Sequence, residues 1–169
     1  MRKSLSALLF LWLVCCSSFF AQAQSLSSQD SVWQKQYEKR ILKKTINGVY
    51  IPANLGEAHR QLNRLISPEA RQKFKQMTED EVRHKLFFSL GRWMTVNWSL
   101  YEGSRLGQRM RVLGLYHPED MAEFIMITYH RKLNKKPLGA KQLIEDMTAK
   151  RKAAWAKRHQ VIVLPKPKS

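Results

Sequence analysis

Signals that start and stop α-helices recur at short intervals along this 169-residue chain. Thr78-Glu79-Asp80-Glu81 is a capping box, in which a threonine hydroxyl and a glutamate side chain each accept a hydrogen bond from the other residue's backbone amide. Ser67 and His117 each precede a proline, which favours the first position of a helix. Ser104 is a further N-cap residue, and Gly114 is a favoured stop. No stretch shows sustained strand alternation, so the sequence predicts an all-α fold.

These signals divide the chain into about six helices of short to medium length, which we expect to form one compact domain. The helix opened at Thr78 carries apolar side chains near a seven-residue rhythm, so we expect it to be the central, aromatic-rich helix. We expect an extended crossing at residues 49–52, after a first helix that ends at Thr45 and is stopped by Asn47-Gly48. The expected helix starts are Asp30 or Ser31, Asn54, Ser67, Thr78, Ser104 and His117, and a last helix is expected from Ala140 to about His159.

The first 23 residues have the features of a secretory signal peptide. Arg2 and Lys3 precede an apolar run, and Ala21-Gln22-Ala23 has the small-residue pattern that signal peptidase reads. The run is shorter than the roughly 20 residues of a membrane span. We therefore expect an exported protein, periplasmic or secreted, with no transmembrane span in the mature chain; a retained N-terminal anchor is the alternative. Cys15 and Cys16 both lie in this segment, which excludes disulfides and cysteine-bound metals from the mature chain.

Positive charge is concentrated near the C-terminus. Residues 131–169 contain 12 Lys or Arg and two acidic residues, whereas residues 24–130 contain 16 basic and 11 acidic residues. Such an asymmetry indicates an anionic partner. The expected organisation is a signal peptide at 1–23, a polar leader at 24–29, a helical domain at 30–135, a basic C-terminal helix at 136–160 and a flexible tail at 161–169.

The last helix combines one narrow apolar stripe with a basic face. Attraction to an anionic surface is worth on the order of 1 kcal/mol per basic residue and weakens with salt; a solvated, solubilising face is the alternative. The expected partners are anionic lipid, an acidic polysaccharide or an unidentified exported protein. Nucleic acid is not expected, because no recognition motif is present. The candidate contact residues are Lys141, Lys150, Arg151, Lys152, Trp155, Lys157 and Arg158.

A second candidate binding region lies where the aromatic helix breaks, at Gly103-Ser104. Trp93 and Asn97 are four residues apart and share a helix face. A broken helix leaves unpaired backbone groups beside aromatic side chains, which favours a ligand pocket; ordinary core packing is the alternative. The candidate pocket residues are Trp93, Asn97, Trp98, Ser104, Arg105, His117, Asp120, His130 and Arg131.

An enzyme, hydrolase-like, is the rival class. It would use Asn97, Ser104, Arg105, His117 and Asp120, and it requires these side chains to converge on one solvent-reachable cavity. Residues 103–107, Gly-Ser-Arg-Leu-Gly, are not a nucleophile elbow. Residues 81–84 have the Glu-x-x-His spacing of di-metal bundles, but the mature chain holds no second copy. We therefore assign no catalytic residue, no metal ligand and no cofactor.

Several motifs occur together between residues 49 and 135. They are Tyr50-Ile51-Pro52, Leu62, Phe74, Trp93-Met94, Trp98, Leu100, Gly103-Ser104-Arg105-Leu106, Gly114, His117-Pro118-Glu119-Asp120-Met121 and Tyr129-His130-Arg131. This combination resembles a bacterial family of small proteins, the domain-of-unknown-function family 6794. The resemblance implies a shared fold and no activity, because the family has none established. Thr95-Val96 departs from the Arg-Asn pair expected in relatives, and the basic extension beyond residue 135 is peculiar to this chain.

Together these features favour an exported, monomeric binding or envelope-associated module that is not an enzyme. The basic C-terminal helix is its expected contact surface. An inhibitor or immunity-type partner of another exported protein is equally compatible with a small helical domain.

Overall fold

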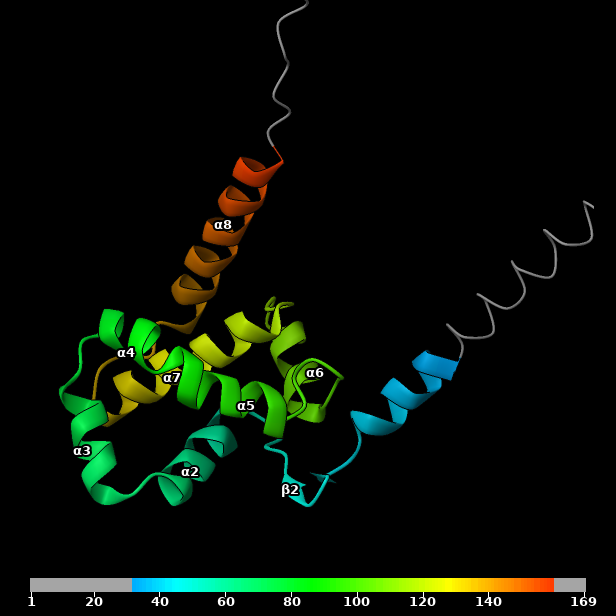
Figure 1. Ribbon diagram of the computed structural model, residues 1–169, viewed down its shortest axis with the longest axis horizontal. Helices are drawn as coiled ribbons and strands as arrows, with labels where there is room; N and C mark the ends of the chain where they lie inside the picture. Colours follow the sequence, from blue (N-terminus) through cyan, green and yellow to red (C-terminus); the bar gives the residue numbers. More distant parts are fainter. Residues whose placement is uncertain (1–31, 160–169) are drawn as a thin grey trace, which may run out of the picture. The chain divides into compact units, whose positions relative to one another are not determined.

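The structure, a computed structural model, describes residues 32–159 (Figure 1). Two compact units divide the chain, Met1–Arg40 and Ile41–Ser169. In the first unit, residues 32–40 are helical. The expected signal peptide, polar leader and C-terminal tail lie outside the described residues.

The second unit is predominantly α-helical, as the sequence predicts. Its helices are α2 (Leu55–Leu65), α3 (Pro68–Gln76), α4 (Glu79–Lys85), the π-helical turn η1 (Phe87–Gly91), α5 (Arg92–Asn97), α6 (Arg105–Val112), α7 (Pro118–Leu133) and α8 (Ala140–Arg158). The strands β1 (Thr45–Ile46) and β2 (Val49–Tyr50) form a small antiparallel pair.

The hairpin corrects the prediction of a first helix that reaches Thr45. The helix ends at residue 40, and Asn47-Gly48 joins β1 to β2 instead of stopping a helix. Both turn residues have positive φ, 50° and 77°. A two-residue Asn-Gly loop with positive φ at both positions matches the twist of the flanking strands, so it closes a hairpin.

The central helix is α7, which corrects the assignment of that place to the helix opened at Thr78. Nine α7 residues are buried, namely every residue from Met121 to His130 except the half-buried Glu123. The helix packs against α2, α3, α4, α5, α6 and α8 (Figure 1). A helix that is apolar on nearly every side belongs in the interior. The segment from Thr78 onward is divided into α4, η1 and α5. Gly91 lies at the division, where an added Cβ would come within 3.3 Å of the Met126 side chain.

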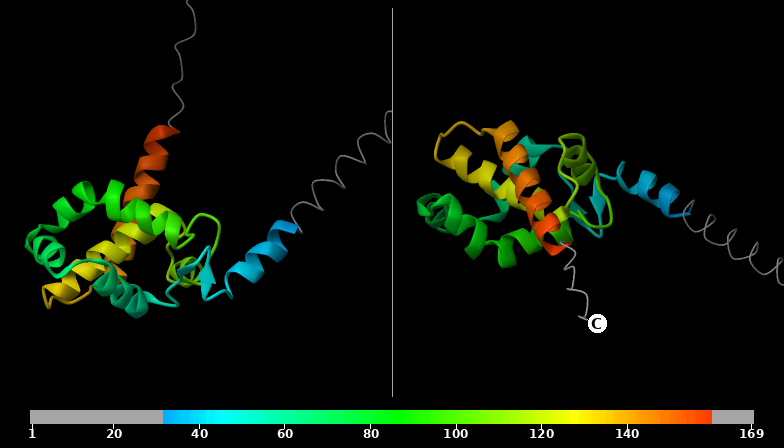
Figure 2. Two further views of the ribbon diagram at one scale, coloured as in Figure 1. Left: turned by 60° about the horizontal axis from the view of Figure 1, so that its bottom comes forward. Right: turned by 90° about the horizontal axis from the view of Figure 1, so that it is seen from above.

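The two halves of α8 differ in their surroundings. Leu143 and Met147 are buried against the core, and Ile144 is partly buried. Every residue from 152 to 159 is exposed. In Figure 1 and in the left view of Figure 2, the C-terminal half of α8 extends beyond the other helices of its unit. None of the helices between residues 32 and 159 is both long and apolar enough to cross a membrane.

Candidate functional site

Near the helix break, Trp98 belongs to the core and Trp93 packs against it. Trp98 is 1% exposed and packs edge-on against Trp93, with ring centroids 5.7 Å apart. The Asn97 side chain donates to the Trp93 carbonyl at 2.9 Å, within its own helix. Ser104 is buried, and its hydroxyl accepts the Gly107 amide at 3.2 Å as an N-cap. The Asn97 side chain and the Ser104 hydroxyl therefore each form a hydrogen bond with a nearby backbone group of their own helix.

Arg105 fastens the hairpin to α6. Its Nε donates to the Ile51 carbonyl at 2.7 Å, and its guanidinium lies 5.0 Å from the centre of the Tyr50 ring. The Glu57 carboxylate is 3.7 Å away. Hydrogen bonds from the Ala53 amide and the Tyr50 hydroxyl, together with Arg105, lower the pKa of Glu57. Arg105 thus contacts β2, the segment that follows it and the first turn of α2.

Asp120 holds α8 against α7. Its two carboxylate oxygens accept hydrogen bonds from Nε and Nη2 of Arg151, each at 2.5 Å. The hydrogen bonds to Asp120 raise the pKa of Arg151 further. Glu119 lies beside this pair, 3.9 Å from Arg151 and 3.6 Å from Nδ1 of His117. Tyr101 donates to Glu119 at 3.3 Å. The first turn of α7 thus carries an ionic cluster at the point where α8 leaves the core.

His130 and Arg131 tie the last turns of α7 to the loop before α4. Nε2 of His130 is 2.8 Å from the Met77 carbonyl. Arg131 donates to both oxygens of Glu79 at 2.7 and 2.8 Å, and to the Leu138 carbonyl at 2.8 Å. The Arg131 guanidinium lowers the pKa of Glu79. The contacts with Met77 and Glu79 join residues that are 53 and 52 positions apart in the sequence.

The five residues of the enzyme interpretation do not gather at one cavity. His117, Asp120, Arg151 and Trp155 line a largely apolar depression of about 330 Å³ between α8 and the segment after α6. Asn97, Ser104 and Arg105 do not line it and have the local roles described above. Among residues 32–159, no group of three or more His, Cys, Asp or Glu side chains is placed to hold a metal ion.

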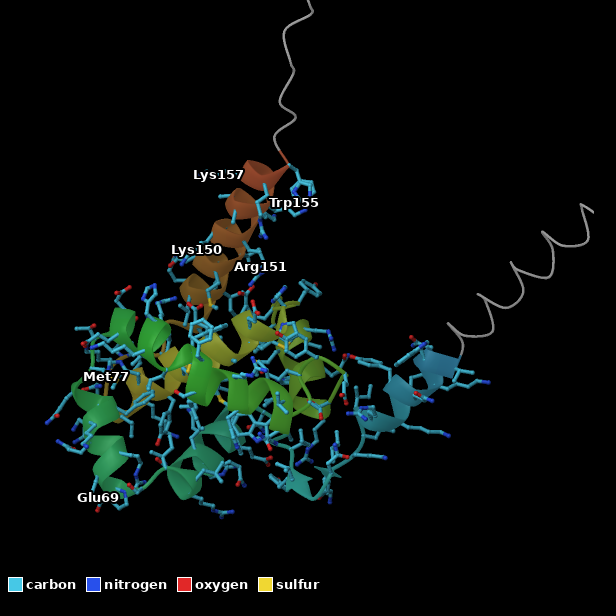
Figure 3. All side chains as sticks on the ribbon, in the orientation of Figure 1. Glu69, Met77, Lys150, Arg151, Trp155 and Lys157 are labelled. Carbon is cyan, nitrogen blue, oxygen red and sulfur yellow. The ribbon has the colours of Figure 1, made fainter. Side chains whose placement is uncertain are left out.

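The candidate basic surface lies along α8. Lys150, Arg151, Trp155 and Lys157 are spaced along the part that extends beyond the other helices (Figure 3). Lys141, Lys150, Lys152, Lys157 and Arg158 are exposed, and Trp155 is 61% exposed, with its ring stacked on His159 at 4.3 Å. Arg151 differs, because the ion pair with Asp120 occupies it.

A second basic feature was not singled out from the sequence. A cavity of about 430 Å³ lies between the first turn of α2 and the end of α7, and we call it the lysine cavity. Its lining residues are Leu55, Gly56, His59, Lys132, Lys135, Lys136 and Leu138. The sequence shows that the lysines are close together along the chain, but only the tertiary fold brings α2 next to them. Burial, with a smaller contribution from the charge of Lys132, lowers the pKa of His59 to about 4.

Comparison with known proteins places the domain without assigning an activity. No curated protein and no solved structure matches the chain significantly. The family described as Domain of unknown function (DUF6794) matches residues 51–133, which run from the end of the hairpin to the last residue of α7. The match ends before α8 begins. Residues 51–133 therefore form a domain of the DUF6794 family, and α8 lies beyond this domain.

Proposed function

We propose that this protein is an exported binding module, not an enzyme, that contacts anionic surfaces through the projecting half of α8. The observation that carries the proposal is the contrast within this helix. Its first half is held by buried Leu143 and Met147, whereas the residues from 152 onward are all exposed. A helix that only completed the core would not need this second half.

The charges of the projecting half support an intermolecular role. Lys150, Lys152, Lys157 and Arg158 are exposed, and none of them forms an ion pair with a carboxylate in the part of the chain that the structure describes. Each basic residue near an anionic surface contributes on the order of 1 kcal/mol, and salt screens the attraction. The exposed Trp155 adds an amphipathic ring of the kind that favours membrane–water interfaces.

The direction of α8 is fixed by the protein itself. The bidentate Arg151–Asp120 pair lies next to the projecting half, so the basic residues are presented on a helix anchored to the core. Export, proposed from the first 23 residues, would give this helix access to anionic lipid, lipid phosphates or acidic polysaccharide.

The test is co-sedimentation with vesicles that contain anionic lipid, using protein without the first 23 residues. In the α8 variant, Lys150, Lys152, Lys157 and Arg158 are changed to Gln and Arg151 is kept. The control variant loses the same charge elsewhere, through Arg64→Gln, Lys73→Gln, Lys75→Gln and Arg109→Gln, all at exposed positions.

The proposal predicts salt-sensitive binding of the wild type, a loss of at least tenfold in the α8 variant and a loss of less than threefold in the control. Equal losses in both variants would show that net charge alone drives the binding. Binding that survives in the α8 variant would place the contact surface elsewhere.

A further inference from the structure

The lysine cavity concentrates positive charge that no described carboxylate neutralises. Lys132, Lys135 and Lys136 line it, and no acidic residue does. None of these three lysines forms an ion pair with a carboxylate between residues 32 and 159. Lysines held together without counter-charge repel one another, so the concavity attracts an anion.

Lys135 has a backbone conformation that lysine seldom adopts. Its φ is 56°, in the left-handed region, at the turn that ends α7. The Lys136 amide closes this turn on the Arg131 carbonyl at 2.8 Å, in the manner of a Schellman motif. Glycine is the usual residue at such a position, and Gly114 ends α6 with a φ of 97°. The turn alone would therefore favour glycine, whereas the residue found there is a lysine that lines the cavity.

His59 also lines the cavity. It is 2% exposed, and its Nε2 lies 3.1 Å from the Thr128 hydroxyl oxygen. That hydroxyl donates to the Phe124 carbonyl at 2.7 Å, so it accepts from His59 and the imidazole carries its proton on Nε2. Nδ1 then holds a lone pair and has no hydrogen bond to the described part of the chain.

The first turn of α2 supplies further donors. Leu55 and Gly56 are the first two helical residues, and amides at these positions have no acceptor within a helix. The Asn54 side chain caps the Glu57 amide and leaves these two uncapped. A helix start with free amides favours a negatively charged group.

We propose that the lysine cavity is a binding site for the phosphate group of a phosphomonoester. Lys132, Lys135 and Lys136 supply the charge, and the first-turn amides of α2 supply directed hydrogen bonds. The volume, about 430 Å³, falls within the range of small-molecule sites and exceeds what a phosphate alone occupies. Leu55 and Leu138 contact the organic group that carries the phosphate. This site is separate from the α8 surface and does not depend on it.

The first test measures binding by calorimetry in phosphate-free buffer. The probes are inorganic phosphate, hexyl phosphate and vesicles that contain phosphatidic acid. Hexyl phosphate is expected to bind saturably and more tightly than inorganic phosphate. The cavity variant, with Lys132, Lys135 and Lys136 changed to Gln, is expected to lose at least tenfold in affinity.

A charge-matched variant controls for non-specific attraction. Changing Lys141, Lys150 and Lys157 to Gln removes the same charge from exposed positions outside the cavity. It is expected to change the affinity for hexyl phosphate by less than twofold. Equal losses in the two variants, or no saturable binding by the wild type, would overturn the proposal. Competition is measured with the charge-matched variant, which keeps the cavity lysines. If vesicles that contain phosphatidic acid compete with hexyl phosphate for this variant, the phosphate is that of a lipid headgroup; if they do not compete, it is that of a soluble phosphomonoester.

The second test separates binding from folding at Lys135. Lys135→Gly removes one cation and places the residue that the left-handed turn favours. The unfolding midpoint is expected to rise while the affinity for hexyl phosphate falls by threefold or more. Nitrogen chemical shifts of His59 provide a direct readout, because a bound phosphate raises the pKa of this imidazole from about 4. The proposed site would be contradicted if Lys135→Gly raised the unfolding midpoint without lowering the affinity, and if the His59 chemical shifts did not change when hexyl phosphate was added.

Discussion

The basic side chains of the helical domain and those of α8 have different partners. Within residues 51–133, Arg105 contacts Glu57, Arg83 pairs with Glu123, and Arg131 binds Glu79 through two hydrogen bonds. Among the basic residues of α8 from Lys150 onward, Arg151 alone has a described carboxylate partner. Paired cations hold helices together, whereas unpaired cations in a fixed arrangement remain available to another molecule. This difference separates three arginines that stabilise the fold from the α8 cations proposed to bind.

The largest expected effect concerns His59, which belongs to the core and also lines the lysine cavity. The unfolded chain protonates this imidazole below pH 6.5, whereas the folded protein keeps it neutral until about pH 4. The stability from neutral His59 is therefore complete above pH 6.5 and is lost as the pH falls to about 4, a total of about 3 kcal/mol.

Urea unfolding at pH 7.0 and pH 4.5, in phosphate-free buffer, measures this loss. His59→Gln retains a donor for Thr128 without a group that titrates, so its stability should change much less between the two pH values. The account of His59 is wrong if the variant and the wild type lose the same amount. Below pH 4.5, both proteins should lose stability as Glu79, whose pKa is lowered in the folded state, becomes protonated.

Neighbouring basic residues in α7 give the next largest contrast. Arg131→Ala removes both hydrogen bonds to Glu79 and the one to the Leu138 carbonyl, which should destabilise the protein by about 2 kcal/mol. Lys132→Ala removes an exposed side chain with no carboxylate partner among the described residues, and should change stability by less than about 0.5 kcal/mol. Thermal unfolding of both variants checks the difference, and equal effects would end the distinction between paired and unpaired cations.

A smaller effect on stability is expected at the contact between α7 and α8. Asp120→Asn weakens the bidentate pair with Arg151 and should cost about 1 kcal/mol. Hydrogen exchange should accelerate along α8 more than along α7, because Leu143 and Met147 would then hold α8 with less support. Asp146→Asn is the control, since Asp146 is exposed and interacts with Gln142 of the same helix at 2.9 Å. Faster exchange in the control would mean that the Arg151–Asp120 pair does not anchor the helix.

The smallest expected effect on stability belongs to the α8 variant. Changing Lys150, Lys152, Lys157 and Arg158 to Gln touches exposed side chains only, so the free energy of unfolding should change by less than about 0.5 kcal/mol. A larger destabilisation in chemical denaturation would show that these residues have partners within the fold.

Local signals in the sequence predicted the helix boundaries that depend on neighbouring residues. The Thr78–Glu81 capping box is present in both directions, and Ser67 and Ser104 cap their helices. The last helix runs from Ala140 to Arg158, one residue short of the expected end. These features follow from hydrogen bonds across three or four residues, which a sequence displays directly.

Features that depend on distant contacts could not be predicted in this way. Arg131 meets Glu79 across 52 positions, and His59 meets Thr128 across 69. The central place of α7 depends on six surrounding helices, and Gly91 lies so close to Met126 that a Cβ there would come within 3.3 Å of its side chain. The hairpin at Asn47-Gly48 was predicted wrongly for another reason. Its signal is local, but an Asn-Gly pair can either end a helix or close a hairpin, and it was assigned to a helix end.

The salt dependence of binding to anionic vesicles tests the central claim most directly. A plot of the logarithm of the binding constant against the logarithm of the salt concentration reports how many charges make the contact. The account predicts a steep negative slope for the wild type and the Arg64, Lys73, Lys75 and Arg109 control, and a slope near zero for the α8 variant. An equally steep slope in the α8 variant would contradict the assignment of the contact surface to α8.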